Sequence, residues 1–102
     1  MPVVIDRPEV VCLCGSARFM AQMHDLAREL GLAGVVVLAP VDAEDAPTPE
    51  QKATLDALHR QKIDLADRVL VVNPGGYVGE STAAEIAYAR ERGKPVEFTD
   101  AR

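Results

Sequence analysis

The chain has 102 residues, a length that fits one domain with a single hydrophobic core, and we take residues 1–102 as that domain. Hydrophobic residues make up 48% and charged residues 26%, which is ordinary for a folded protein and argues against disorder. With a net charge of −5 the chain offers no basic stripe to a nucleic-acid polymer. No apolar run approaches the roughly 18 residues of a membrane span, and residues 1–8 lack the features of a signal peptide, so we expect a cytoplasmic protein without a membrane partner.

Four short segments rich in Val, Leu and other strand-forming residues are predicted to form strands. They cover residues 10–14, 35–39, 69–72 and 96–99. Three helices are predicted between them, over residues of about 17–30, 49–66 and 81–92. Gly31 and Gly93 supply the ends of the first and third helices. Thr48 and Pro49 supply the N-cap and first turn of the second helix.

The alternation of these elements predicts an α/β fold. We expect a flavodoxin- or Rossmann-like three-layer sandwich, with a four-stranded parallel sheet in the order 2-1-3-4 and helices on both faces. In such sheets, ligands bind beyond the carboxyl ends of the strands, where the strand order reverses. Here the reversal lies between the first and third strands, so the loops that follow these two strands are predicted to form one site.

The loop after the first strand carries residues suited to an anion. Gly15 permits close backbone approach, Ser16 caps the helix and donates its hydroxyl, and Arg18 offers a planar fork that matches phosphate. The alternative is a plain helix cap with a solvated arginine. Under the first interpretation, the ligand is a phosphorylated small molecule.

The loop after the third strand runs from Asn73 into the third helix and brings backbone N–H groups to the positive end of that helix. Asn73 and Ser81 are the polar side chains expected to face a ligand, with Gly79 between them. Tyr77 either stacks on a base or covers the loop. The pattern is neither a dinucleotide fingerprint nor a Walker loop.

Glu85 and His59 are the candidate catalytic residues. Glu85 stands one turn inside the third helix, on a flank that faces the predicted cleft. The alternative is a capping box, in which Thr82 is the N-cap and the Glu85 side chain accepts the backbone N–H of that N-cap residue. His59 lies beside an expected inner stripe of the second helix, and a hydrogen-bonded core histidine is its alternative; the stripe consists of Leu55, Leu58, Lys62 and Leu65.

Two further features have plain interpretations. Cys12 and Cys14 point the same way from the first strand and are interpreted as buried reduced thiols, in preference to a redox or metal role. We therefore expect no metal and no cofactor. Residues 40–50 carry three prolines and four acids and are predicted to form an exposed loop, with a lid or a second carboxylate as the alternative.

Several motifs together resemble the nucleoside 2-deoxyribosyltransferase superfamily, and are most similar to its small 2′-deoxynucleoside 5′-phosphate N-hydrolases. The matching segments are residues 14–18, 66–72, 80–89 and 93–96. Residues 35–55 carry no matching motif. The resemblance implies the fold predicted above and an active site between the two loops.

The resemblance also implies a role for each site residue. In that family a glutamate on the helix after the third strand attacks the anomeric carbon, which corresponds to Glu85. The family's helper aspartate falls on His59. The 5′-phosphate would lie near Ser16, Arg18, Gly79 and Ser81. Members are commonly dimers or larger, so a homodimer or larger homo-oligomer is expected.

The sequence therefore predicts an N-glycosidase or N-glycosyl transferase acting on a nucleoside 5′-monophosphate through Glu85. A non-catalytic module that binds a nucleotide in the same pocket is the alternative. In both cases the partner is a small nucleotide or nucleoside.

Overall fold

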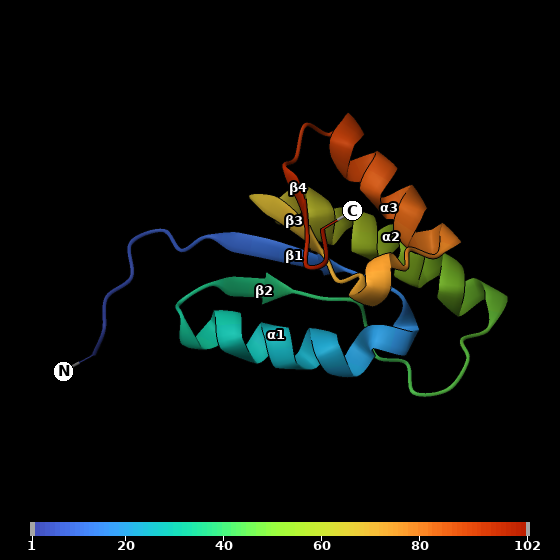
Figure 1. The fold of residues 1–102 in the computed structure, drawn as a ribbon, viewed down its shortest axis with the longest axis horizontal. Helices are drawn as coiled ribbons and strands as arrows, with labels where there is room; N and C mark the ends of the chain where they lie inside the picture. The colour runs from blue at the N-terminus through green and yellow to red at the C-terminus, as the bar shows by residue number, and fades with distance from the viewer. Residues whose placement is uncertain (1, 102) are drawn as a thin grey trace.

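A computed structural model describes residues 2–101 of the chain (Figure 1). Four strands, three helices and two short 3-10 turns follow one another in the predicted alternation. In chain order they are β1 (Val10–Cys14), η1 (Ala17–Phe19), α1 (Met20–Leu32), β2 (Val36–Leu38), α2 (Pro49–Leu65), β3 (Arg68–Val71), η2 (Pro74–Gly76), α3 (Glu80–Glu91) and β4 (Val96–Phe98). Each predicted element is present, with bounds within a few residues of those expected.

The four strands form one parallel sheet in the order β2-β1-β3-β4. Helix α1 covers one face of the sheet, while α2 and α3 cover the other (Figure 1). The fold is thus the predicted three-layer α/β sandwich. Strands β1 and β3 are neighbours in register from Val11 and Arg68 onward, so their following loops leave the sheet side by side.

Side chains of β1 alternate between two hydrophobic cores. Val11 and Leu13 pack with Met23 of α1 on one face. Cys12 and Cys14 pack on the other face, against α2 and α3. This alternation is what sets two cysteines side by side beneath the helix that carries His59.

Helix α1 ends later than predicted. It continues through Gly31 to Leu32, and the left-handed residue beyond it is Gly34, whose φ is 88°. Gly34 takes the conformation that a glycine tolerates at a helix C-terminus, whereas Gly31 is an ordinary helical residue. The prediction that Gly31 ends the helix is therefore wrong.

Helix α2 begins as predicted, but its buried stripe differs. Thr48 is its N-cap and forms a capping box with Gln51, and Pro49 is the first helical residue. The expected stripe is wrong for two of its three leucines, because Leu58 is 43% and Leu65 is 69% exposed, whereas Leu55 is half-buried. The helix is turned so that His59 and Ile63 are its buried residues.

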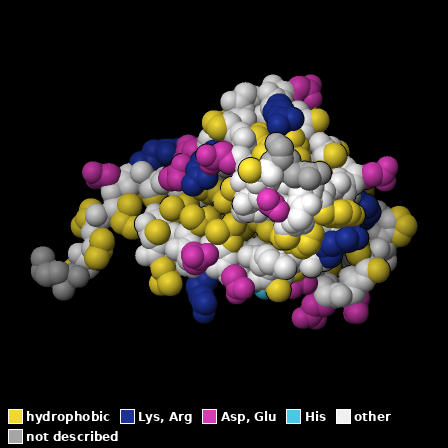
Figure 2. All heavy atoms as spheres, in the orientation of Figure 1, with side chains coloured by type: hydrophobic (Ala, Val, Ile, Leu, Met, Phe, Trp, Pro, Cys, Tyr) yellow, Lys and Arg dark blue, Asp and Glu magenta, His cyan; other side chains and the backbone are white. Residues whose placement is uncertain are grey.

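The N-terminal segment extends away from the globule, and its apolar side chains Val3, Val4 and Ile5 are exposed (Figures 1 and 2). Arg7 anchors the segment through two bonds to Asp67, whose carboxylate also accepts the backbone N–H of Val10. On the face drawn in Figure 2, Lys and Arg side chains lie in separate small groups. None of the helices within residues 2–101 combines the length and apolar character needed to cross a membrane.

Candidate active site

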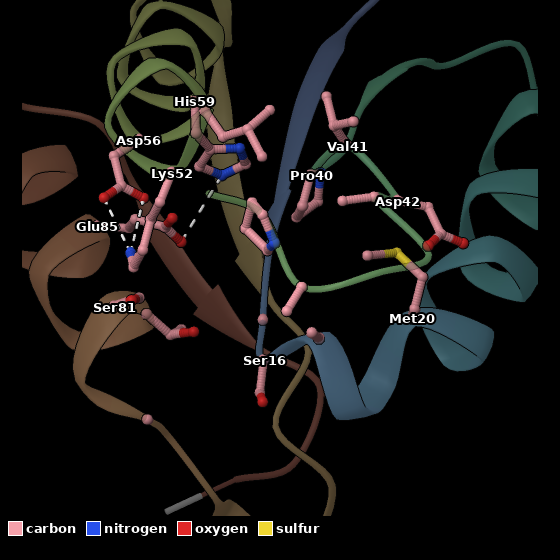
Figure 3. A pocket seen from close by; sticks show the side chains of 18 of the residues that line it. Ser16, Met20, Pro40, Val41, Asp42, Lys52, Asp56, His59, Ser81 and Glu85 are labelled. Atoms are coloured by element: carbon pink, nitrogen blue, oxygen red, sulfur yellow. Dashed lines mark hydrogen bonds and ion pairs between the residues drawn. The ribbon is translucent and has the colours of Figure 1, made fainter. Parts of the chain in front are cut away.

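A pocket of about 770 Å³ opens at the carboxyl ends of β1 and β2, between α2 and the first turn of α3 (Figure 3). Its volume suits a small-molecule ligand, for which pockets of about 300–1,000 Å³ are usual. The loop after β1 contributes Gly15 and Ser16, and the start of α3 contributes Gly79 and Ser81. The two loops predicted to share a site therefore do line one cavity.

Glu85 projects into this pocket from α3 (Figure 3). Its side chain is 19% exposed. The capping-box alternative is not what the structure has, because Gly79 is the N-cap and Thr82 is a buried residue inside the helix. Thr82, Ile86 and Ala89 are the buried residues of α3, and Glu85 shares their side of the helix while facing the cavity.

His59 projects from α2 toward Glu85, with its Nε2 atom 3.7 Å from Oε1 of the carboxylate (Figure 3). The imidazole is only 5% exposed. Within the described part of the chain, its Nδ1 atom has no hydrogen-bond partner. Nε2 is therefore the atom through which His59 makes its polar contacts.

Burial and charge shift both groups. Burial raises the pKa of Glu85 above its ordinary 4.5, and the neighbouring His59 only partly opposes this. Burial lowers the pKa of His59, but a hydrogen bond with Cys12 and the charge of Glu85 outweigh it, so the pKa lies above 6.5 overall. A buried acid and a buried base with shifted pKa values thus lie side by side in the pocket, which is typical of functional sites.

The two cysteines lie behind His59. Its Nε2 is 3.3 Å from Sγ of Cys14 and 3.7 Å from Sγ of Cys12. The contact between the thiols lowers the pKa of Cys12 to about 6 and raises the pKa of Cys14. Both side chains are buried and neither forms a disulfide, which agrees with free thiols.

The first turn of α3 is left open toward the pocket. No side chain caps it at Gly79, and the first N–H groups of a helix have no intrahelical acceptor. Ser16 faces the same cavity from the other loop, where its Oγ accepts the N–H of Arg18 at 3.4 Å. Four of the residues predicted to contact a polar ligand therefore line this pocket: Gly15, Ser16, Gly79 and Ser81.

Two expected ligand-binding side chains are placed elsewhere. Arg18 does not line the pocket, and its guanidinium lies 3.9 Å from the ring centroid of Tyr77. Asn73 is fully buried and hydrogen-bonds with Thr99 and Asp100. Tyr77 does line the pocket, so the stacked pair of Arg18 and Tyr77 ties the two loops together at its rim.

The sequence missed three polar residues of α2 that line the pocket, Lys52, Asp56 and Lys62. Lys52 and Asp56 form an ion pair with a separation of 3.0 Å. Lys62 donates to the carbonyl of Ala39. Their spacing from His59 could have revealed them, because positions 52, 56, 59 and 62 lie three or four residues apart and therefore share one face of the helix.

The acidic loop is exposed from Val41 onward, as predicted, and it also forms a wall of the pocket. Residues 40–47 all line the cavity, among them Asp42, Glu44 and Asp45. Together with Asp56, Glu80 and Glu85 they give the lining six carboxylates, against the two lysines named above. The field inside the pocket is therefore negative on balance.

No family model matches the chain. A search of curated proteins likewise gives no match. Among solved structures, a protein described as 2-desoxiribosyltransferase from Leishmania mexicana superposes with a TM-score of 0.66 at 21% identity, over 93% of this chain and 67% of the other. This likeness shows that the chain shares that protein's fold.

Proposed function

We propose that this protein cleaves the base–sugar bond of a nucleoside 5′-monophosphate, as an N-glycosidase or N-glycosyl transferase. The observation that carries the proposal is the pairing of Glu85 with His59 on one wall of a pocket built by both switch-point loops. The shared fold with a deoxyribosyltransferase supports the same reaction class. Of the segments that resemble the nucleoside 2-deoxyribosyltransferase superfamily, residues 14–18 and 80–89 contribute to the lining of this pocket.

In the proposed mechanism Glu85 is the nucleophile. A carboxylate oxygen attacks C1′ of the sugar, the C–N bond breaks, and its electron pair leaves with the base, which takes up a proton. The result is a glycosyl ester on Glu85. Attack by water at C1′ then returns the free carboxylate and releases the sugar, whereas attack by a second base gives transfer.

His59 is the proposed acid–base helper. A protonated imidazole 3.7 Å from Glu85 favours the ionised carboxylate that the first step requires. The hydrogen bond with Cys12 and the charge of Glu85 raise the pKa of His59 above 6.5 despite its burial, which favours this protonated form. The same imidazolium is the group proposed to hand a proton to the departing base.

A 5′-phosphate is proposed to bind at the first turn of α3. The N-terminal N–H groups of a helix attract anions, and Gly79 and Ser81 line the pocket there, opposite Ser16. Lys52, at the edge of the cavity, supplies a positive charge. Arg18, stacked on Tyr77, would have to leave that ring to take part.

One observation favours an uncharged nucleoside as a second candidate substrate. Six carboxylates face two lysines in the lining, and such a field opposes an anion. The acidic wall at residues 40–47 would instead accept hydrogen bonds from sugar hydroxyls or base amino groups. The reaction at C1′ would be unchanged.

A base-release screen tests the proposal. Purified protein is incubated with each common nucleoside and its 5′-monophosphate, in ribose and deoxyribose forms, and free base is measured by chromatography. We expect release from at least one substrate, and its loss in Glu85→Gln. Binding by calorimetry without any base release would instead support the non-catalytic nucleotide-binding module.

The protein is also proposed to form a homodimer. Leu58 and Leu65 leave an apolar strip on α2 exposed, which a second copy would cover. Light scattering coupled to gel filtration measures the mass, and a monomer at micromolar concentration would contradict this part of the proposal.

A further inference from the structure

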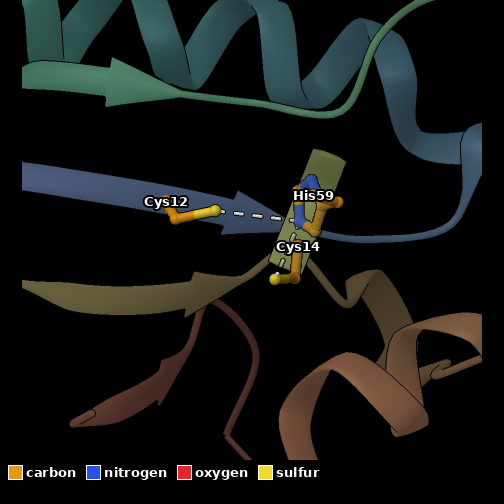
Figure 4. A group of neighbouring side chains, drawn as sticks. All are labelled: Cys12, Cys14 and His59. Atoms are coloured by element: carbon orange, nitrogen blue, oxygen red, sulfur yellow. Dashed lines mark hydrogen bonds between the residues drawn. The ribbon is translucent and has the colours of Figure 1, made fainter. Parts of the chain in front are cut away.

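We propose that Cys12, Cys14 and His59 form a binding site for a thiophilic divalent cation of the zinc class at the inner end of the pocket. The three side chains come together from β1 and α2 (Figure 4). Their ligand atoms all lie within 4.8 Å of one another, and all three residues are buried. This inference does not rest on the proposed enzymatic activity, although it uses His59.

The spacing of the donor atoms matches that of ligands around one ion. With Zn–S near 2.3 Å and Zn–N near 2.0 Å in a tetrahedral site, the sulfur and nitrogen ligands stand about 3.5 Å apart. The two Sγ···Nε2 distances are 3.7 and 3.3 Å. The two values bracket the expected separation, which supports a single ion held by these three atoms.

The chemistry of the donors selects the class of metal. Two thiolates and an imidazole favour zinc and similar soft or borderline ions over magnesium or calcium, which prefer oxygen. On binding, both thiols release their protons, and two thiolates balance a divalent charge. The resulting site is neutral, which suits a place where Cys12 and Cys14 are fully buried.

The pocket gives the site an entrance and a fourth position. His59 and Glu85 line the cavity, whereas the two thiols lie behind them. Oε1 of Glu85 is 3.7 Å from the same Nε2 atom. Three protein ligands with a fourth position open to a carboxylate or an exchangeable molecule is the arrangement found in zinc sites that remain reactive.

Cobalt(II) is the first probe, because thiolate ligation gives a charge-transfer band in the near ultraviolet. The full chain, kept reduced with a phosphine, is titrated with Co(II) alone and then with Zn(II), and zinc affinity is measured against a chromophoric chelator. We expect the band to saturate at one Co(II) per chain and to disappear when zinc displaces the cobalt. A chain that gives no band, or that binds Cu(I) but not Zn(II), would overturn the assignment.

Variants locate the site. Cys14→Ala and Cys12→Ala are expected to lose the band and to weaken zinc binding by more than the about 10- to 100-fold that loss of an outer-shell partner costs. His24→Ala is the matched control, because His24 offers a surface imidazole 3.8 Å from a carboxylate oxygen of Asp42. Unchanged zinc affinity in both cysteine variants, or its loss in His24→Ala, would contradict the site.

Circular dichroism checks that each variant folds. If the cysteine variants do not fold, the Co(II) charge-transfer band of the unaltered chain decides whether the thiols bind metal. Neither measurement needs a nucleoside or any turnover. Zinc binding without base release would support this site and count against the proposed enzyme, and base release without zinc binding would do the reverse.

Discussion

Nε2 of His59 and Oε1 of Glu85 lie 3.7 Å apart, although 26 positions separate the two residues in the sequence. They meet because α2 and α3 cover the same face of the sheet and both reach its carboxyl edge (Figure 1). Burying an acid and a base costs free energy, and titratable groups buried in a cleft are concentrated at functional sites. This contact is therefore the part of the pocket on which we place the chemistry.

Glu85→Gln keeps the shape of the side chain but removes the nucleophilic carboxylate. We expect base release to fall by at least about 10³-fold, as when an essential nucleophile is removed from other enzymes. Chromatography of free base over a prolonged incubation measures the loss. Glu91→Gln changes an exposed glutamate of the same helix that does not line the pocket, and should leave the rate unchanged. Equal rates in Glu85→Gln and the parent would remove the mechanism.

His59→Gln is expected to slow base release by about 10²- to 10⁴-fold, the usual contribution of a general acid or base. If His59 protonates the departing base, a nucleoside whose base already carries a positive charge should lose much less activity in this variant. The measurement is the ratio of the parent rate to the His59→Gln rate, taken once with the neutral base and once with the charged base. A loss of the same size with the charged base would mean that His59 only positions Glu85.

Gly15→Ala tests the close approach of the two loops. A Cβ atom at Gly15 would lie 3.0 Å from the carbonyl oxygen of Val72 and 3.2 Å from the sulfur of Met23. Overpacking of this kind costs about 1–3 kcal/mol, so the urea midpoint should fall. Gly31→Ala is the control: nothing lies within 4 Å of its added Cβ, and alanine at this helical position should stabilise the protein by up to about 1 kcal/mol.

Asp67→Asn tests the anchor of the N-terminal segment. The hydrogen bonds from Arg7 and the N–H of Val10 lower the pKa of Asp67 below its ordinary 3.8. A carboxyl whose pKa is lower in the folded state stabilises the fold above its unfolded pKa and loses this contribution as the pH falls through the folded value. The parent should therefore have the higher melting temperature near neutral pH, and the difference should shrink below pH 3.8. A difference that does not change with pH would contradict this account.

The sheet was predictable because its signals are local. The first three strands are short apolar runs, Pro95 and Asp100 bound the fourth, and the alternation of strands with helices leaves few topologies. The buried face of α2 was not predictable in the same way. A leucine row at residues 55, 58 and 65 competes with a row at residues 59, 63 and 66, and the cysteine side of β1 accepts the second row.

Strand order predicts which loops line the pocket, whereas the directions of individual side chains depend on parts of the chain far away in the sequence. Gly15, Ser16, Gly79 and Ser81 line the pocket because strand order alone fixes where these loops meet. The direction of Asn73 depends on the segment after β4, which folds back to satisfy a buried amide. Lys52 and Asp56 face the pocket because the acidic loop, which comes before their helix, forms its opposite wall, and no local pattern in the sequence indicates that arrangement.

The hydrogen bonds of Asn73 fasten Asp100 beneath the loop that carries Tyr77, at the rim of the pocket. A purification tag or fluorescent label fused to this end of the chain would therefore begin within a few residues of Asp100, close to that loop. The opposite end of the chain projects away from the globule, so an attachment there leaves the pocket alone (Figure 1). The choice of fusion site thus decides whether the measurements above sample the native rim.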